Sequence, residues 1–174
     1  LNRKYAPTYY RYSFLLLFTG RLEEAIAKGR KALELEPFSL FYNHHLGFTH
    51  YYARHYDTAI LIFESTLELD PNYHFTWEFM GLTFLFKKRF EDAAHALNRW
   101  AELTSIDKEA LKLYVSLVEK HARTGEPVAY PPELESVFPY HFYPFLGHKK
   151  QSLELLERCY KEEQYWYLQL CKSF

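Results

Sequence analysis

A short phrase that ends in proline occurs twice in this chain, at an interval of 34 residues. Residues 31–37 read KALELEP, and residues 65–71 read STLELDP. Small residues recur at the same interval in two series, which are Ser13, Gly47 and Gly81, and Ala25, Ala59 and Ala93. Proline ends a helix, and 34 residues accommodate two helices with their turns. The period therefore predicts pairs of helices that stack on one another along the chain.

The period also predicts where the units begin and end. Pro7 suits the first turn of a helix, and Gly20 suits a helix end. Beyond the third unit, apolar residues at helical spacing, among them Leu111, Tyr114 and Val118, predict one more amphipathic helix. We expect a single domain over residues 1–174, with repeats at about 6–39, 40–73 and 74–107, an extra helix at about 107–123, a proline-rich segment at 127–144, and a degenerate repeat or cap at about 132–172.

Composition excludes several classes of protein. Acidic and basic residues nearly cancel, at 22 against 21, so no long-range field favours nucleic acid or an anionic membrane. No stretch approaches the roughly 20 apolar residues that cross a bilayer. Two cysteines, Cys159 and Cys171, are too few for a disulfide framework, which favours a reduced, cytoplasmic setting. Because the chain begins at Leu1 rather than Met, we expect it to be a piece of a longer protein.

The motif set over residues 6–105 resembles the tetratricopeptide repeat (TPR) family. It consists of three in-phase copies of a small residue on the first helix and an alanine on the second, with two terminal prolines. The resemblance implies an all-α, right-handed solenoid of helix-turn-helix repeats that binds proteins and is not an enzyme. More loosely, residues 138–170 resemble the degenerate last repeat of TPR modules in bacterial multidomain regulators, through Leu146, Gly147, Lys149, Leu156, Glu157, Tyr160 and Trp166. That second resemblance implies a sensory or regulatory role.

In TPR arrays the first helix of each repeat lines the concave surface, so its groove-facing residues are the candidate contacts for a partner. The aromatic share of the chain is 20%, and the repeat register places many of these rings on that surface. A contiguous apolar patch usually marks an interface. The candidate site residues are Tyr10, Phe14, Phe18, Phe41, His44, Phe48, Tyr51, Tyr52, Phe75, Glu78, Leu82 and Phe86.

Other kinds of site find little support. TPR domains that grip a C-terminal carboxylate carry Lys, Asn and Arg where this chain has Tyr10, Phe14, Phe41 and His45, so the donors for a carboxylate are missing. No catalytic motif is present, and no cofactor is expected. Four histidines crowd one helical hairpin, but none is three or four residues from another, so we interpret them as ordinary groove and surface side chains rather than metal ligands: His44, His45, His50 and His55.

Three functions remain open from the sequence. The first is binding of a protein segment, or of another domain of the same polypeptide, through the aromatic groove, because buried rings give large contact area at low entropy cost. The second is sensing of a small molecule such as a sugar, for which the polar candidates are Asn43, His44, His45 and Glu78. The third is homodimerisation through the same patch. The sequence does not decide whether the proline-rich segment covers the groove.

Overall fold

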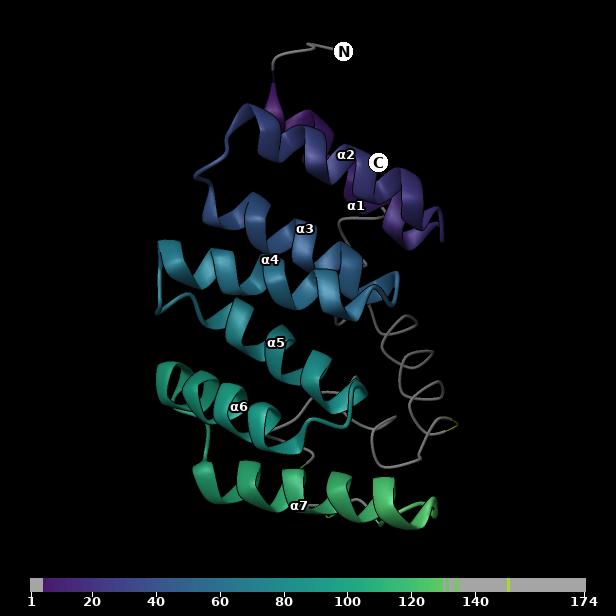
Figure 1. Ribbon diagram of the computed structural model, residues 1–174, viewed down its shortest axis with the longest axis vertical. Coiled ribbons are helices and arrows are strands. Elements are labelled where there is room, and N and C mark those ends of the chain that lie inside the picture. Colours follow the sequence, from purple (N-terminus) through teal and green to yellow (C-terminus); the bar gives the residue numbers. More distant parts are fainter. Residues whose placement is uncertain (1–4, 130, 132–133, 135–149, 151–174) are drawn as a thin grey trace, which may run out of the picture. The chain divides into compact units, whose positions relative to one another are not determined.

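A computed structural model of the chain describes residues 5–129, 131, 134 and 150 (Figure 1). The chain divides into two compact units, Leu1–Thr104 and Ser105–Phe174. Each unit is described by itself. The degenerate repeat or cap at 132–172, the resemblance at 138–170 and both cysteines lie outside the described residues, apart from Leu134 and Lys150.

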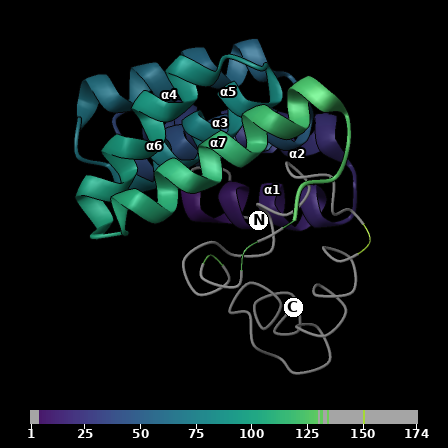
Figure 2. The same cartoon turned by 90° about the horizontal axis from the view of Figure 1, so that it is seen from below.

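The first unit consists of three pairs of helices that follow one another in chain order. Within each pair the helices pack closely, and successive pairs also contact each other through α2 with α3 and α4 with α5. In the view from below, the pairs overlie one another (Figure 2). The bounds are α1 Ala6–Phe18, α2 Leu22–Leu35, α3 Leu40–Tyr52, α4 Tyr56–Leu69, α5 His74–Phe86 and α6 Phe90–Thr104.

Small residues at the repeated positions let the two helices of a pair approach closely. Ala25, Ala59 and Ala93 are completely buried. At Gly47 an added Cβ would lie 2.5 Å from the ring of Phe63. Glycine at this position therefore allows α3 and α4 to touch, and a larger side chain would force them apart.

All three pairs share the same turn between their helices. Gly20, Arg54 and Lys88 occupy the equivalent position, and all have positive φ, at 75°, 61° and 57°. In each turn the residue after that position donates its N–H to a carbonyl five residues earlier, as Arg21 does to Leu16 at 2.9 Å. This bond and its neighbours satisfy carbonyls that a helix end would leave unpaired.

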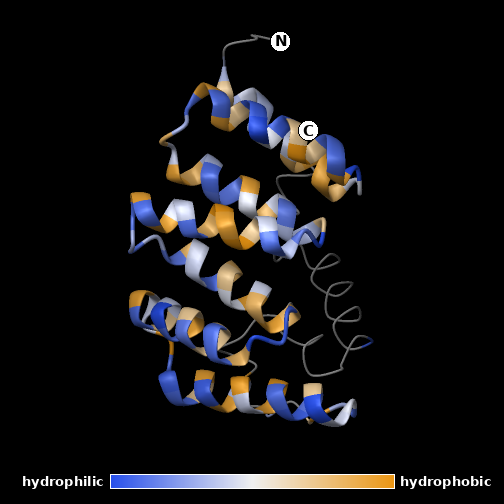
Figure 3. Cartoon of the chain, viewed as in Figure 1, coloured by the Kyte–Doolittle hydropathy of each residue, from blue (hydrophilic) through white to orange (hydrophobic). Residues whose placement is uncertain are grey.

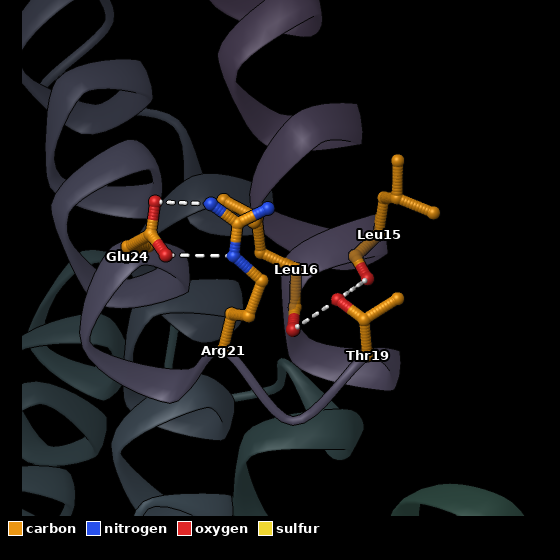
Figure 4. A network of polar contacts seen from close by, with 5 residues as sticks. All are labelled: Leu15, Leu16, Thr19, Arg21 and Glu24. Carbon is orange, nitrogen blue, oxygen red and sulfur yellow. Dashed lines mark hydrogen bonds and ion pairs between the residues drawn. The ribbon is translucent and has the colours of Figure 1, made fainter.

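Polar side chains add to the first of these turns (Figure 4). The hydroxyl of Thr19 donates to the carbonyls of Leu15 and Leu16, each at 3.1 Å. Arg21 donates to both carboxylate oxygens of Glu24, at 2.7 and 2.6 Å. Because this ion pair is exposed to solvent, it orients the start of α2 more than it stabilises the fold.

In the second unit the structure describes one helix, α7 Lys108–Thr124. Asp107 caps its first turn by accepting the N–H of Glu109 at 2.9 Å. Gly125, with φ of 74°, ends it in the left-handed conformation that glycine adopts without strain. One side of the helix is buried, and its residues are Leu111, Tyr114, Val115 and Val118.

The prediction of an all-α helical-repeat solenoid is confirmed for the described part of the chain, where the ordered elements are helices. Figure 3 shows alternating hydrophilic and hydrophobic bands along α2 and α6, as expected for helices with one buried face. By contrast, α5 is largely apolar, with Met80, Leu82, Phe84 and Leu85 all buried. Among the described residues, no helix is both long enough and apolar enough to cross a membrane.

Candidate binding surface

An unbroken path of ring contacts crosses the first helix of each repeat. It runs from Phe18 to Phe14 at 4.7 Å between ring centroids, and from Phe14 to His45 at 6.0 Å. His45 leads to Phe48 at 6.3 Å and Phe48 to Phe79 at 4.8 Å. Tyr51 then joins Phe79 to Phe86, at 5.5 and 5.7 Å. We call this surface of α1, α3 and α5 the aromatic face.

Several rings of the aromatic face reach solvent. Five aromatic residues have nearly half of their surface exposed to solvent. The exposed fractions are 44% for Phe18, 46% for Phe41, 48% for Tyr52, 47% for Phe75 and 44% for Phe86. Four more of the predicted contacts are half-buried beside them: Tyr10, Phe14, Phe48 and Tyr51. Glu78, the acidic residue among the predicted contacts, is half-buried as well.

Two of the predicted contacts are placed differently from the rest. Leu82 is only 1% exposed, so its side chain contributes packing rather than contact surface. The imidazole of His44 is enclosed by rings from α3, α4 and α5, and its Nδ1 lies 3.1 Å from the Thr76 hydroxyl. Burial lowers the pKa of His44 to about 3, and neighbouring His45 and His74 act in the same direction. His44 therefore joins α3 to α5 as a neutral side chain.

The interpretation of the histidines as groove and surface side chains is wrong for His45 and His50, which are 4% and 6% exposed. Ser13 donates its hydroxyl proton to the carbonyl of Ala25 at 2.7 Å, so it accepts from His45 Nε2 at 2.8 Å. This assigns the proton of the neutral imidazole to Nε2. Burial lowers the pKa of His45 to about 3, because a second proton would place a charge inside the first two repeats.

The polar groups proposed for a sugar site are used within the protein. The amide nitrogen of Asn43 donates to the carbonyls of Pro37 and Ser39, both at 3.0 Å, and thereby ties the loop before α3 to that helix. His44 and His45 are bonded to Thr76 and Ser13. Three of the four polar candidates are thus committed to bonds within the protein, and a single carboxylate, Glu78, does not make a sugar site.

The sequence reasoning did not select two tyrosines near the predicted contact Tyr10, namely Tyr42 in α3 and Tyr73 immediately before α5. Tyr10 packs against Phe41 and Tyr42, at 4.6 and 5.9 Å between ring centroids. Burial, together with the nearby phenols of Tyr42 and Tyr73, raises the pKa of Tyr10 to about 12. Tyr42 and Tyr73 lie next to the starts of α3 and α5 and not at the positions that face the groove. Choosing residues by their position in the repeat therefore does not select them.

Metal-ligating side chains do not converge in the described part of the chain, where no three His, Cys, Asp or Glu residues are arranged to hold an ion. The rings of His50 and His55 lie 5.6 Å apart, and Glu23 is 3.8 Å from His55. Nδ1 of His50 is buried without a hydrogen-bond partner among the described residues. Burial lowers the pKa of His50, which favours the neutral form.

Comparisons with known proteins agree with the helical repeat. A family model described as "Tetratricopeptide repeat" matches residues 6–39, the stretch that contains α1 and α2. The chain is 29% identical over 107 residues to human "Tetratricopeptide repeat protein 13". That alignment covers 62% of this chain and 11% of the relative, so the chain spans a small part of the relative's length.

Proposed function

We propose that this chain, which belongs to the tetratricopeptide repeat proteins, binds a segment of a partner protein, or another domain of the same polypeptide, through the aromatic face of α1, α3 and α5. Repeats of this family generally mediate protein–protein interaction rather than catalysis. The observation that carries the proposal is the unbroken path of rings from Phe18 to Phe86 across three repeats. Both ends of the path are 44% exposed, and Phe41, Tyr52 and Phe75 of the same helices are exposed to a similar extent.

The chemistry of this face favours an apolar protein segment. Together α1, α3 and α5 contain two side chains with formal charge, Arg11 and Glu78, whereas α2 by itself contains six. Rings that are half-buried in the free protein lose little rotamer freedom when a partner covers them. Aromatic side chains that fill such surfaces are the residue types that dominate the energy of protein interfaces.

The surface also favours a protein over a sugar. A sugar needs several donors and acceptors around one ring, and the internal bonds of Asn43, His44 and His45 remove three of the four candidates. A protein segment needs fewer, because its own apolar side chains supply the contact area.

The test compares two double variants that remove similar apolar area from opposite helices of the repeats. Phe18→Ser with Phe86→Ser changes the aromatic face, and Leu61→Ser with Leu69→Ser changes α4, where these residues are 63% and 45% exposed. Each protein serves as bait, circular dichroism confirms that it folds, and captured proteins are quantified against the unaltered chain. We expect the first variant to lose its specific partners and the second to keep them.

Retention of every partner by the first variant, together with loss from the second, would show that α4 carries the interaction and would contradict the proposal. Homodimerisation is a separate outcome. If sizing shows that the unaltered chain is a dimer and that Phe18→Ser with Phe86→Ser makes it a monomer, the aromatic face is a self-interface and no partner segment occupies it.

A further inference from the structure

One stripe of the first helix is buried in the second and third repeats. In α3 it consists of four residues at helical spacing, with exposed fractions of 7%, 4%, 6% and 0%: Tyr42, His45, Leu46 and Thr49. In α5 the same positions, 34 residues later, hold Thr76, Phe79, Met80 and Thr83. Phe79 is half-buried, and the other three are buried.

The second helix of the preceding repeat covers this stripe. Tyr42 of α3 packs in one buried cluster with Ala32 of α2. A Cβ added at Gly29 of α2 would lie 3.4 Å from Leu46 and 3.7 Å from His45. The next repeat is joined in the same way, because α4 contacts α5. The stripe is therefore the surface on which a further helix packs.

In α1 the same stripe is open to solvent. Its residues, which we call the outer face of α1, are Thr8, Arg11, Tyr12 and Leu15. Tyr12 is 36% and Leu15 41% exposed, whereas the equivalent residues of α3 are 6% and 0% exposed. In the described part of the chain, no helix occupies on α1 the place that α2 occupies on α3.

Two positive side chains border the apolar pair on the outer face. Arg11 is exposed, and the Lys28 ammonium of α2 lies 5.5 Å from the centroid of the Tyr12 ring. Neither forms an ion pair with another described residue. Lys28 influences the Glu24 carboxylate, but both oxygens of that group are bound by Arg21. The outer face is therefore apolar in the middle and positive at its border.

Arg11 determines what kind of helix fits this face. The equivalent His45 is buried as a neutral side chain, whereas a guanidinium cannot lose its charge and is costly to bury without an acidic partner. A helix that covers α1 therefore needs carboxylates beside its apolar stripe. In this chain α4 shows that such a helix can cover a first helix, because it packs on α5 and its charged residues are Asp57, Glu64 and Glu68.

We propose that the outer face of α1 binds an acidic amphipathic helix of a partner protein, in the position that α2 holds on α3. Apolar side chains of the partner helix pack on Tyr12 and Leu15, and its carboxylates pair with Arg11 and Lys28. A partner that comes and goes leaves Arg11 hydrated when it is absent, which a permanently packed repeat does not. The outer face is separate from the aromatic face, so this inference does not depend on the proposed function.

The first experiment uses a peptide with the sequence of residues 55–71, which contains α4 with four acidic residues and no Lys or Arg. Its control has Asn and Gln in place of those four residues and keeps every apolar side chain. Fluorescence anisotropy measures binding of both labelled peptides to the unaltered chain. We expect the acidic peptide to bind, the control to bind about fivefold more weakly, and the difference to shrink at high salt. Absence of binding by the acidic peptide, or equal binding of both, would overturn the inference.

Variants locate the site of binding. Tyr12→Ser with Leu15→Ser is expected to weaken binding of the acidic peptide at least tenfold, and Arg11→Glu about tenfold because attraction becomes repulsion. Lys112→Glu makes the same change of charge at an exposed position of α7 and should leave binding unchanged, as should Phe86→Ser on the aromatic face. Circular dichroism confirms that each variant folds. Undiminished binding by both α1 variants would place the peptide elsewhere and overturn the inference.

Two other occupants of the outer face give different results. If analytical ultracentrifugation shows that the unaltered chain is a dimer and that Tyr12→Ser with Leu15→Ser makes it a monomer, a second copy covers the face. If hydroxyl radicals fail to oxidise Tyr12 and Leu15 in the whole polypeptide without a partner, another of its own segments covers them. Either result would overturn the inference, and neither bears on the aromatic face.

Discussion

Lowering the pH from 7.5 to 5.0 is expected to destabilise the folded chain, because His45 is buried as a neutral imidazole. His45 is 4% exposed, and burial lowers the pKa of its imidazole to about 3. In the unfolded chain the same group binds a proton with a pKa of about 6.5. Below pH 6.5 the unfolded state therefore holds more protons than the folded state, and stability falls as pH falls. The loss continues until the folded group titrates near pH 3.

The size of the effect follows from the difference between the two pKa values. Each histidine of this kind lowers the free energy of unfolding by about 1.4 kcal/mol for every pH unit below 6.5. His45 alone therefore accounts for a loss of about 2 kcal/mol at pH 5.0. His44, whose pKa is also lowered to about 3, contributes a similar amount. A total near 4 kcal/mol is a large part of the stability of an ordinary domain, which is about 5–15 kcal/mol.

Urea unfolding followed by circular dichroism between pH 5.0 and 7.5 measures the loss. His45→Gln isolates the part due to His45, since the glutamine amide can still donate to Ser13 but cannot titrate. The plot of unfolding free energy against pH should be shallower for this variant, by about 1.4 kcal/mol per unit below pH 6.5. The same slope in the variant and in the unaltered chain would refute the assignment of a buried, neutral His45.

Two further predictions concern the packing and the turns of the repeats. Gly47→Ala and Gly81→Ala should each lower the unfolding free energy by about 1–3 kcal/mol, because the new Cβ atoms would lie 2.5 Å from the Phe63 ring and 2.6 Å from Leu97; urea midpoints equal to that of the unaltered chain would contradict this. Arg54→Gly and Lys88→Gly should raise it by up to about 1 kcal/mol, since both residues have positive φ and glycine adopts that region without strain. A lower thermal midpoint in either glycine variant would mean that the side chain removed stabilises more than the backbone strain costs.

The helical repeat was predictable because packing leaves a periodic mark on the sequence. Two helices can approach closely only where each repeat has a small residue at the same position. Ala25, Ala59 and Ala93 are these residues, and their regular interval is visible in the sequence. The turns leave a weaker mark. Gly20 indicates a helix end, but Arg54 and Lys88 occupy the same left-handed position without any glycine to show it.

The surface was less predictable, because burial across repeats does not follow from spacing within one helix. His45 reads as a groove residue in the register of α3, yet Ser13 of the preceding repeat binds it. Asn43 reads as a free amide, yet it ties the loop before its own helix. Leu82 has the register of Phe14 and Phe48 but is buried. The burial of His45 depends on a contact 32 residues away, and the role of Asn43 depends on a loop conformation; neither has a local sequence signal.

The most direct test of the binding surface is hydroxyl-radical footprinting of the whole chain, with and without the protein or peptide that it captures. The account predicts that protection is concentrated on rings of α1, α3 and α5, at Phe18, Phe41, Phe75 and Phe86, while Leu61 and Leu69 of α4 are oxidised as before. Protection of Leu61 and Leu69 with unchanged oxidation of the four phenylalanines would contradict it.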